Sequence, residues 1–453
     1  MMHPLRRDDY TVGWVCALDV ELAAAQEMLD EEHPKLERDP ADNDENLYTF
    51  GSMSGHNVVI VSLPAGRIGN NPATAVAAQM RATFKKIRFG LMVGVGGGVP
   101  SAEADVRLGD VVVCVPAKVF GGVVQYDVGK TTASGFERTG SLDSPPQVLL
   151  AAVKQVKANE LRNISKLDEH ITKLERLTAF KRCKAGPDIL FEAASRHEGG
   201  QTCDKCNSNQ HKAREPRNSG EEVVTHHGTI ASGNQVIKDA TVRDKLSAEL
   251  GGVLCFEMEA AGLMNSFPCL VVRGVCDYAD SHKNERWQAY AAGTAAAYAK
   301  EVLRVIPSTA VDKTPALDKI MNQRTTKRRL DNDSTRKSSK RARLSRRKGK
   351  FDDLGHDEDN RTSSEDDENG GSGDDESGSS GDDESESSGN NQSESSEDND
   401  SVSSGDTDSV SSGDTDSVSS GDDESGSSGA NDSENSRVDE QTDSESESES
   451  QWQ

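Results

Sequence analysis

The stretch VLCFEMEAAGLMNSFPCLVVRGVCDYAD, residues 253–280, decides the fold. Its two apolar runs, 253–256 and 268–276, have the Val, Leu and Cys content that is typical of parallel strands buried on both faces. A short helix of small residues is expected between them. The first run is followed by Glu257, Met258 and Glu259 and the second by Asp277, so carboxylates follow both strands. Because ligands bind beyond the carboxyl ends of strands in open α/β sheets, these acids indicate a site.

Each of these acids also has a structural explanation. Glu259 stands where the helix dipole favours an acid in the first turn, and Asp277 stands where a loop carboxylate can cap backbone N–H groups. For each acid taken singly, the structural explanation and the functional one are equally well supported.

Strands and helices alternate through the rest of the first 305 residues. The pattern predicts strands over 10–18, 56–64, 87–98, 106–116 and 222–233. Helices are expected over 19–29, 71–84, 145 into the 150s, 238–250 and 286–303. This alternation predicts an α/β protein, a three-layer α/β/α sandwich around a largely parallel or mixed central sheet.

Charge divides the chain into a domain and a tail. Residues 1–305 hold 35 Lys and Arg against 39 Asp and Glu, whereas residues 306–453 hold 17 against 39. The second part has two aromatic residues and cannot bury enough apolar surface to offset its ordering entropy. We therefore predict a folded domain over 1–305 with a polar insertion at about 160–222, a basic linker over 306–350 and a disordered, acidic, Ser-rich tail over 351–453.

The tail suggests two kinds of partner. Basic clusters at 327–329 and 340–343, ten residues apart, are typical of a bipartite nuclear localisation signal, so we expect an import receptor to bind 327–343 and the protein to be nuclear or nucleocytoplasmic. A nucleic-acid-binding arm is the main alternative. The acidic part repeats SVSSGD and suits solubility, masking of the basic stretch or binding to basic proteins. The sequence does not choose among these roles.

No apolar run reaches the ~18 residues that cross a bilayer, and no signal-peptide core precedes the first strand. We therefore expect an intracellular protein that does not enter membranes. Five of the cysteines lie in or beside predicted core strands, which predicts reduced thiols that pack as small hydrophobes. They are Cys16, Cys114, Cys255, Cys269 and Cys276.

Three further clusters point toward the same crevice. Glu21 follows the first strand, although acids are also common at a helix N-terminus. Gly66 and Arg67 form a glycine turn with a guanidinium that suits an anionic oxygen, although a solvated loop Arg is equally well supported. Gly96 and Gly97 end a strand and let the backbone approach a ligand. The glycines lack the helix and the later acid that a dinucleotide site requires, so the NAD interpretation is rejected.

Together these segments resemble the superfamily of purine nucleoside phosphorylases, uridine phosphorylases and methylthioadenosine/S-adenosylhomocysteine nucleosidases, and most of all its fungal members. The resemblance covers about residues 10–304. The segments that carry it are ALDVEL at 17–22, VGVGGGV at 93–99, RLGDVVV at 107–113, TIASG at 229–233, FEMEAAG at 256–262 and VVRGVCDYAD at 271–280.

The resemblance implies cleavage of an N-glycosidic bond through a cation-like ribosyl transition state. Asp277 matches the family's general acid, which protonates the purine. Glu259 matches the acid that accepts hydrogen bonds from the ribose hydroxyls, with Met258 packed on the sugar. Glu21 matches the carboxylate that, with Arg273, orients the attacking water in the nucleosidase branch.

The chain departs from the family where a Ser or Thr commonly helps to hold phosphate or water, because Val95 stands there. Phosphorolysis and hydrolysis both remain open, with hydrolysis slightly favoured. No cofactor is expected, apart from phosphate as the co-substrate of phosphorolysis. Homo-oligomers are common in the superfamily, so we expect one. The alternative function is a catalytically inactive nucleoside-sensing or interaction module that acts through its charged tail.

The polar insertion contains Cys203 and Cys206 in a single CxxC, with His197 and His211 nearby. Because one CxxC without a second pair is a weak zinc signal, a flexible loop with reduced thiols is favoured over a zinc knuckle, and no metal site is predicted. A long insertion of this kind also suits a lid.

Overall fold

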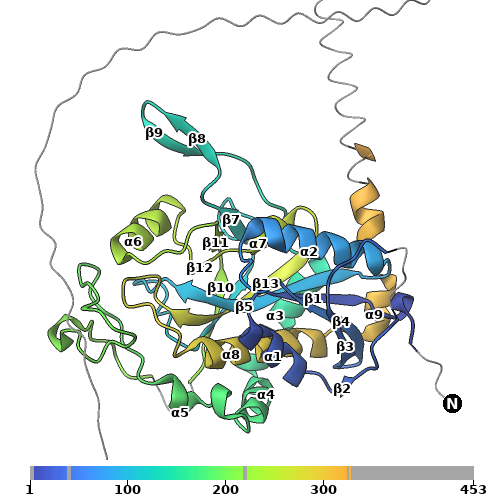
Figure 1. Ribbon diagram of the computed structural model, residues 1–453, viewed down its shortest axis with the longest axis horizontal. Helices are drawn as coiled ribbons and strands as arrows, with labels where there is room; N and C mark the ends of the chain where they lie inside the picture. The colour runs from blue at the N-terminus through green and yellow to red at the C-terminus, as the bar shows by residue number, and fades with distance from the viewer. Residues whose placement is uncertain (1–4, 38–41, 218–221, 324–325, 328–453) are drawn as a thin grey trace, which may run out of the picture. The chain divides into compact units, whose positions relative to one another are not determined.

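The computed structural model describes residues 5–37, 42–217, 222–323 and 326–327 (Figure 1). The chain divides into two compact units, Met1–Glu358 and Asp359–Gln453, of which the second lies wholly outside the described residues. The predictions for the basic segment from 328 onward and for the acidic tail therefore fall outside them as well.

The described strands are β1 Val12–Cys16, β2 Glu31–Glu32, β3 Tyr48–Met53, β4 His56–Ser62, β5 Phe89–Gly98, β6 Val111–Cys114, β7 Val123–Gln125, β8 Gly129–Thr132, β9 Gly135–Arg138, β10 Thr225–Gly228, β11 Ile230–Ser232, β12 Cys255–Glu257 and β13 Cys269–Asp277. The described α-helices are α1 Asp19–Glu27, α2 Asn70–Thr83, α3 Gln147–Leu161, α4 Leu167–Leu174, α5 Arg182–Ala185, α6 Ala240–Glu249, α7 Ala260–Met264, α8 Gln288–Arg304 and α9 Ser308–Lys313. Short 3-10 turns lie at Arg7–Asp9, Thr178–Phe180 and Ser208–Gln210.

The central sheet is mixed, with the strand order β10-β6-β13-β5-β1-β4-β3-β2. Strands β13, β5, β1 and β4 run parallel in its middle, and antiparallel neighbours β6 and β3 flank them. The parallel strands are buried along most of their length, as their continuous apolar runs predicted. Their carboxyl ends therefore converge on one edge of the sheet.

Helices cover both faces of this sheet, so the predicted three-layer α/β/α sandwich is confirmed (Figure 1). On one face, α8 packs on β13 and β5 and contacts α1, α3 and α4. On the other, α2 packs against α7 and β1. Helix α8 packs closely on β13. The contact requires glycine at position 274, because a Cβ at Gly274 would overlap the backbone of Ala291.

A second, smaller core lies beside the main one. It joins β7, β11 and β12 to the start and end of α6 through buried residues such as Tyr126, Ile237, Leu250 and Phe256. Strand β12 links the two cores because it pairs with β11 and also with the end of β5.

Three sequence expectations differ from the structure. Strand β12 meets β5 antiparallel at Gly97 and Gly98 and does not neighbour β13, because it crosses the end of β5 instead of entering the parallel core. The insertion at 160–222 is not wholly polar, since α4 buries apolar residues against α8. Packing also continues past residue 305, where Val311 and Leu317 are 1% and 0% exposed.

The cysteines behave as the sequence predicted. All eight are free, and the five in or beside core strands are buried. Within the described ranges, no helix combines the length and the apolar character needed to cross a lipid bilayer.

Candidate active site

A cavity of about 190 Å³ lies at the carboxyl ends of the parallel strands. Among the predicted site residues, its wall contains Glu21, Gly96, Gly97, Met258, Glu259 and Asp277, and Val95 also lines it. These residues come from β5, from the first turn of α1, from the turn after β12 and from the end of β13. The structure therefore brings together side chains that are more than 250 residues apart in sequence.

Glu21 is fixed at the cavity by the start of α1. Its Oε2 accepts the backbone N–H groups of Ala17 at 2.6 Å and Leu18 at 3.1 Å, and its Oε1 accepts that of Val95 at 2.8 Å. Burial raises the pKa of Glu21, and Arg273 together with these three donors lowers it only in part. The carboxylate thus caps the helix and also presents a proton acceptor to the cavity.

Arg273 lies beneath this cavity and holds three carboxylates. Its side chain is 1% exposed, and its Nη2 donates to Glu257 and, at 3.2 Å, to Glu259. Its Nη1 lies 3.9 Å from the Oε1 of Glu21 and donates to the carbonyl of Val95 at 3.4 Å. Because removing one partner of a buried ion cluster leaves charge uncompensated, losing Arg273 would cost about 3–5 kcal/mol of stability.

Glu259 is oriented toward the cavity from the turn that precedes α7. Its Oε1 accepts the backbone N–H of Gly69 at 3.2 Å, which Gly69 can offer because its φ is +100°. Burial raises the pKa of Glu259 to about 7; Arg273 lowers it, and the charges of Glu257 and Glu21 raise it further. Its protonation state therefore changes near neutral pH.

Asp277 lines the same cavity from the end of β13 and is paired with Lys283. Its Oδ1 accepts the backbone N–H of Ala279 at 2.8 Å, and its Oδ2 contacts the Nζ of Lys283. Burial lowers the pKa of Lys283, but the charge of Asp277, its hydrogen bond and the nearby Cys276 and Cys255 thiols together outweigh that effect, so the pKa lies above the ordinary value for a lysine. Lys283 also lines the cavity and places a protonated ammonium beside the carboxylate.

The structure separates Gly66 and Arg67 from the other predicted residues. Both line an adjoining groove of about 1050 Å³, which shares Ala17, Leu18 and Ile68 with the first cavity. Among the described residues, no ion pair or side-chain hydrogen bond holds the guanidinium of Arg67. Gly66 and Arg67 therefore lie beside the carboxylate site and not within it, and their role in anion binding stays a prediction.

Sequence reasoning missed two residues of this site. Glu257 was seen as part of a polar cluster but given no role, although it accepts hydrogen bonds from Arg273 and from the backbone of Glu259 and Ala260. Lys283 had no strand or helix pattern to mark it. The available signal was its place six residues after Asp277, which lets a loop fold back on the carboxylate.

The chain is an α/β sandwich with a buried, acid-lined cavity at the carboxyl ends of its parallel strands, as in ligand-binding α/β proteins. The sequence of the phosphorylase superfamily matches residues 11–307, so the chain belongs to that superfamily.

Two relatives and one solved structure show the extent of the similarity. A nucleotide-binding leucine-rich repeat (NLR)-like protein of Hyaloscypha variabilis is 45% identical over 309 residues, which are 68% of this chain and 30% of that protein. The chain thus spans less than a third of that relative. A 5′-methylthioadenosine/S-adenosylhomocysteine nucleosidase of Mycobacterium bovis is 25% identical over 303 residues, 66% of this chain and 97% of the nucleosidase. The corresponding nucleosidase of Neisseria meningitidis, solved with methylthio-immucillin-A, aligns with a TM-score of 0.43 and 16% identity over 65% of this chain and 98% of its own.

Proposed function

We propose that this protein hydrolyses the N-glycosidic bond of a purine nucleoside or nucleotide. The observation that carries the proposal is the charge arrangement of one cavity. Three buried carboxylates surround Arg273 on one side, and the Asp277–Lys283 pair lies on the other. A nucleosidase relative that this chain matches over 97% of its length supports the same chemistry.

The carboxylate side suits the sugar. Cleavage develops positive charge on the ribose, and at an effective dielectric constant of 20 a carboxylate about 4 Å away stabilises a unit charge by roughly 4 kcal/mol. Glu259 accepts hydrogen bonds from the ribose hydroxyls, and Met258 packs beside the ring. Glu21 takes a proton from the attacking water, which its raised pKa favours.

The Asp277–Lys283 pair suits the leaving base. Asp277 contacts the purine nitrogen, and Lys283 holds a proton beside the carboxylate. When the C–N bond breaks, its electron pair goes to the base, which takes one proton from the Asp277–Lys283 pair. The water oxygen bonds to the sugar carbon and gives one proton to Glu21, so charge and protons balance.

Water is a better nucleophile here than phosphate. A phosphate dianion beside Glu21 would meet the same carboxylates that stabilise a cation, and the two cations, Arg273 and Lys283, are already paired. The only polar groups of Val95 are its backbone N–H and C=O. The N–H donates to Glu21 and the C=O accepts from Arg273, so neither is left to hold phosphate. The site therefore favours hydrolysis over phosphorolysis.

The adjoining groove suits the 5′ side of the substrate. It opens beside the cavity, and Arg67 offers its guanidinium there. A 5′-phosphate would find a cation in this groove, well suited to a phosphate group. We therefore expect nucleotides to be cleaved as well as nucleosides, and Arg67→Ala to impair cleavage of nucleotides selectively.

The test is a product assay on the full-length protein with adenosine, inosine, methylthioadenosine, AMP and ATP, each with and without phosphate. Free base and free ribose that do not depend on phosphate would support hydrolysis. Ribose 1-phosphate formed only with phosphate would select phosphorolysis. Tight nucleoside binding without any base release would overturn the proposal and favour the inactive sensing module.

A further inference from the structure

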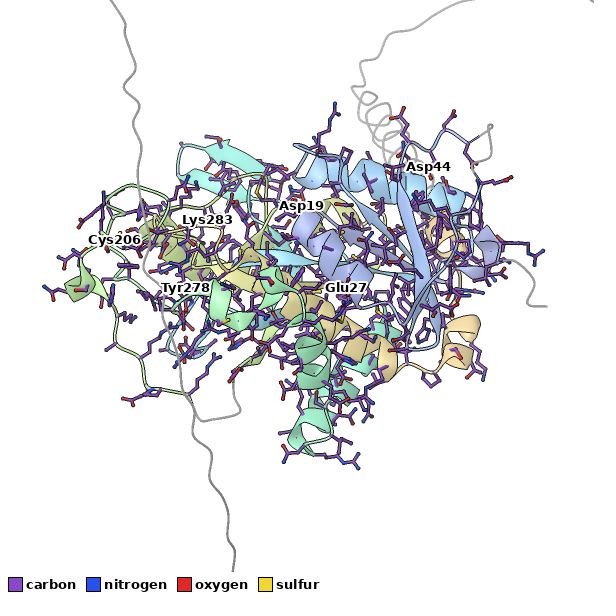
Figure 2. The ribbon with its side chains drawn as sticks, turned by 60° about the horizontal axis from the view of Figure 1, so that its bottom comes forward. Asp19, Glu27, Asp44, Cys206, Tyr278 and Lys283 are labelled. Atoms are coloured by element: carbon purple, nitrogen blue, oxygen red, sulfur yellow. The ribbon has the colours of Figure 1, made fainter. Side chains whose placement is uncertain are left out.

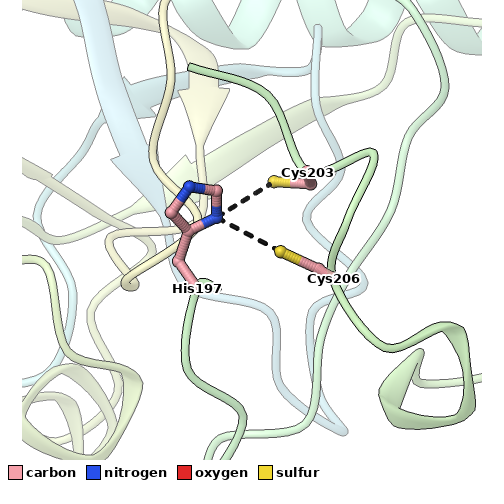
Figure 3. A group of neighbouring side chains, drawn as sticks. All are labelled: His197, Cys203 and Cys206. Atoms are coloured by element: carbon pink, nitrogen blue, oxygen red, sulfur yellow. Dashed lines mark hydrogen bonds between the residues drawn. The ribbon is translucent and has the colours of Figure 1, made fainter. Parts of the chain in front are cut away.

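We propose that His197, Cys203 and Cys206 bind one zinc ion behind the loop that carries Asp277 and Lys283. The three side chains form a single cluster in the insertion, with their ligand atoms within 4.8 Å of one another (Figure 3). They lie outside the carboxylate cavity and take no part in the proposed glycosidic chemistry. The inference is therefore independent of the proposed function.

The geometry of the cluster suits a tetrahedral ion. The Nδ1 of His197 lies 3.8 Å from the Sγ of Cys203 and 3.2 Å from that of Cys206 (Figure 3). Zinc–nitrogen and zinc–sulfur bonds of about 2.0 and 2.3 Å at tetrahedral angles require nitrogen–sulfur separations of roughly 3.5 Å. The two cysteines are joined by a tight turn, in which the N–H of Cys206 donates to the carbonyl of Cys203 at 3.0 Å.

The hydrogen bonds of His197 prepare its ring for a metal. Its Nε2 lies 3.1 Å from the carbonyl oxygen of Gly200, which can only accept, so Nε2 carries the proton. The lone pair is then on Nδ1, which faces both sulfurs. A ligand histidine whose second ring nitrogen donates to a backbone carbonyl is the usual arrangement at zinc sites.

A fourth ligand is also within reach. Cys203 and Cys206 line a cavity of about 240 Å³ whose wall includes His211 and His282. A water molecule in this cavity can complete the tetrahedron. Cys276 and Asp277 form part of the same wall, so the cluster lies directly behind the candidate active site.

The position of the cluster gives the ion a structural role. The N–H of His197 donates to the Oγ of Ser281 at 3.1 Å, and the Sγ of Cys203 lies 3.7 Å from the carbonyl of His282. Both contacted residues belong to the loop between Asp277 and Lys283. Figure 2 labels Cys206, Tyr278 and Lys283 at the same end of the folded unit. A bound ion would therefore anchor the insertion against this loop.

The direct test is the metal content of the full-length protein, purified without chelators from zinc-supplemented medium. We expect about one zinc per chain, and less than a tenth of that in His197→Ala and in the Cys203→Ser/Cys206→Ser double variant. Cys183→Ser is the matched control, because Cys183 is exposed and outside the cluster, and it should keep its zinc. All variants retain the acidic tail, so ions held by its carboxylates cancel in the comparison.

Cobalt replacement tests the site without relying on variants that fold. Co²⁺ in the wild-type protein should give thiolate-to-metal charge-transfer absorption and the visible bands of tetrahedral cobalt, which carboxylates do not give. Chelation should also increase hydrogen exchange at 195–211 and 277–283. Wild-type protein with no more zinc than the double variant, or without thiolate–cobalt absorption, would overturn the proposal; a Cys203–Cys206 disulfide would be one such result.

Discussion

Glu21 shows that one side chain can satisfy a structural and a chemical requirement at once. Its carboxylate accepts two backbone N–H groups at the start of α1, as a helix-capping acid does, and a third from β5. The helix terminus and β5 therefore fix a buried carboxylate at the cavity through backbone N–H groups, and the Nη1 of Arg273 lies 3.9 Å from its Oε1. The two explanations that the sequence offered for this residue are not exclusive.

The role of Asp277 can be tested with Asp277→Asn. The amide oxygen can still accept the N–H of Ala279, so the fold should be retained, but the ion pair with Lys283 is lost. We expect base release to fall by roughly 10²- to 10⁴-fold, the usual contribution of a positioned acid. The measurement is kcat at saturating substrate, with thermal unfolding as the folding check. Asp244→Asn, on the exposed side of α6, is the control, and equal activity in both variants would exclude Asp277 from the chemistry.

Nucleoside affinity should depend on the protonation of Glu259. Its pKa is raised to about 7, and only the ionised form can accept both ribose hydroxyls, so affinity should fall by up to about tenfold for each pH unit below 7 and level off above it. Calorimetric titration of the non-cleaving Asp277→Asn protein with adenosine measures this profile.

Glu259→Gln in the same background is the control, because the amide does not titrate. We expect weaker binding and a flatter profile from this variant. An unchanged slope would assign the titration to another group, of which Glu21 is the nearest with a raised pKa.

Three of the predicted residues that line the cavity lie at element ends. Glu21, Glu259 and Asp277 follow strands whose apolar runs are unmistakable, and parallel strands bring their carboxyl ends together. Lys283 and Arg67 lie in irregular loops. No period in the sequence predicts which way such a loop folds, so the partner of Asp277 and the position of Gly66 and Arg67 beside the cavity were found only in the structure.

At the scale of elements, the end of β5 is rich in glycine because side chains from other segments lie directly against its backbone and leave no room for a Cβ. A Cβ at Gly94 would overlap the Oε1 of Glu21 and lie 2.5 Å from the Nη1 of Arg273. A Cβ at Gly97 would lie 2.8 Å from the Oδ1 of Asp277. The glycines that suggested close approach of a ligand therefore leave room for Glu21, Arg273 and Asp277, the side chains for which we propose a catalytic role.

Gly94→Ala should consequently damage both stability and activity. The added methyl group must displace Glu21 or Arg273, and both are buried and held by hydrogen bonds, so we expect a loss of about 1–3 kcal/mol in the free energy of unfolding. Base release should fall more than tenfold in the folded fraction.

Denaturant unfolding and initial rates on the same samples measure the two effects. Val95→Ala is the neighbouring control, because it keeps both backbone bonds, to Glu21 and to Arg273. Normal activity in Gly94→Ala would show that the position of Glu21 is not needed for the reaction.

The strands that the sequence missed are those without long apolar runs. The β8–β9 hairpin and the strands β2, β3 and β7 lack long apolar runs, and their pairing is set by contacts with neighbouring strands or, in the hairpin, by the turn. Helix α4 was missed because the insertion was judged by its polar composition, whereas Leu167, Ile171 and Leu174 recur at helical spacing. Long buried runs define the fold class; short elements depend on what packs against them.

At the scale of the whole molecule, charge distinguishes the domain that contains the cavity from the segment that we propose as a localisation signal. The near-neutral first 305 residues contain the cavity, while 13 basic residues fall within 324–350 and 35 acidic residues within 351–453. This division of charge is visible in the sequence alone. We propose that the basic segment directs the protein to the nucleus through an import receptor.

The two clusters of that segment allow import to be distinguished from nucleic-acid binding. An import receptor recognises clusters at fixed places, so Lys340→Ala/Arg341→Ala should shift a fluorescent full-length fusion from the nucleus to the cytoplasm. Arg336→Ala/Lys337→Ala removes the same charge between the clusters and should leave the distribution unchanged. A nucleic-acid arm would respond to total charge, so the two pairs would reduce retention equally and binding to DNA would weaken alike in both. Microscopy of the three fusions together with salt-dependent DNA binding separates these outcomes, and a nuclear fusion unaffected by either pair would exclude 327–343 as the import signal.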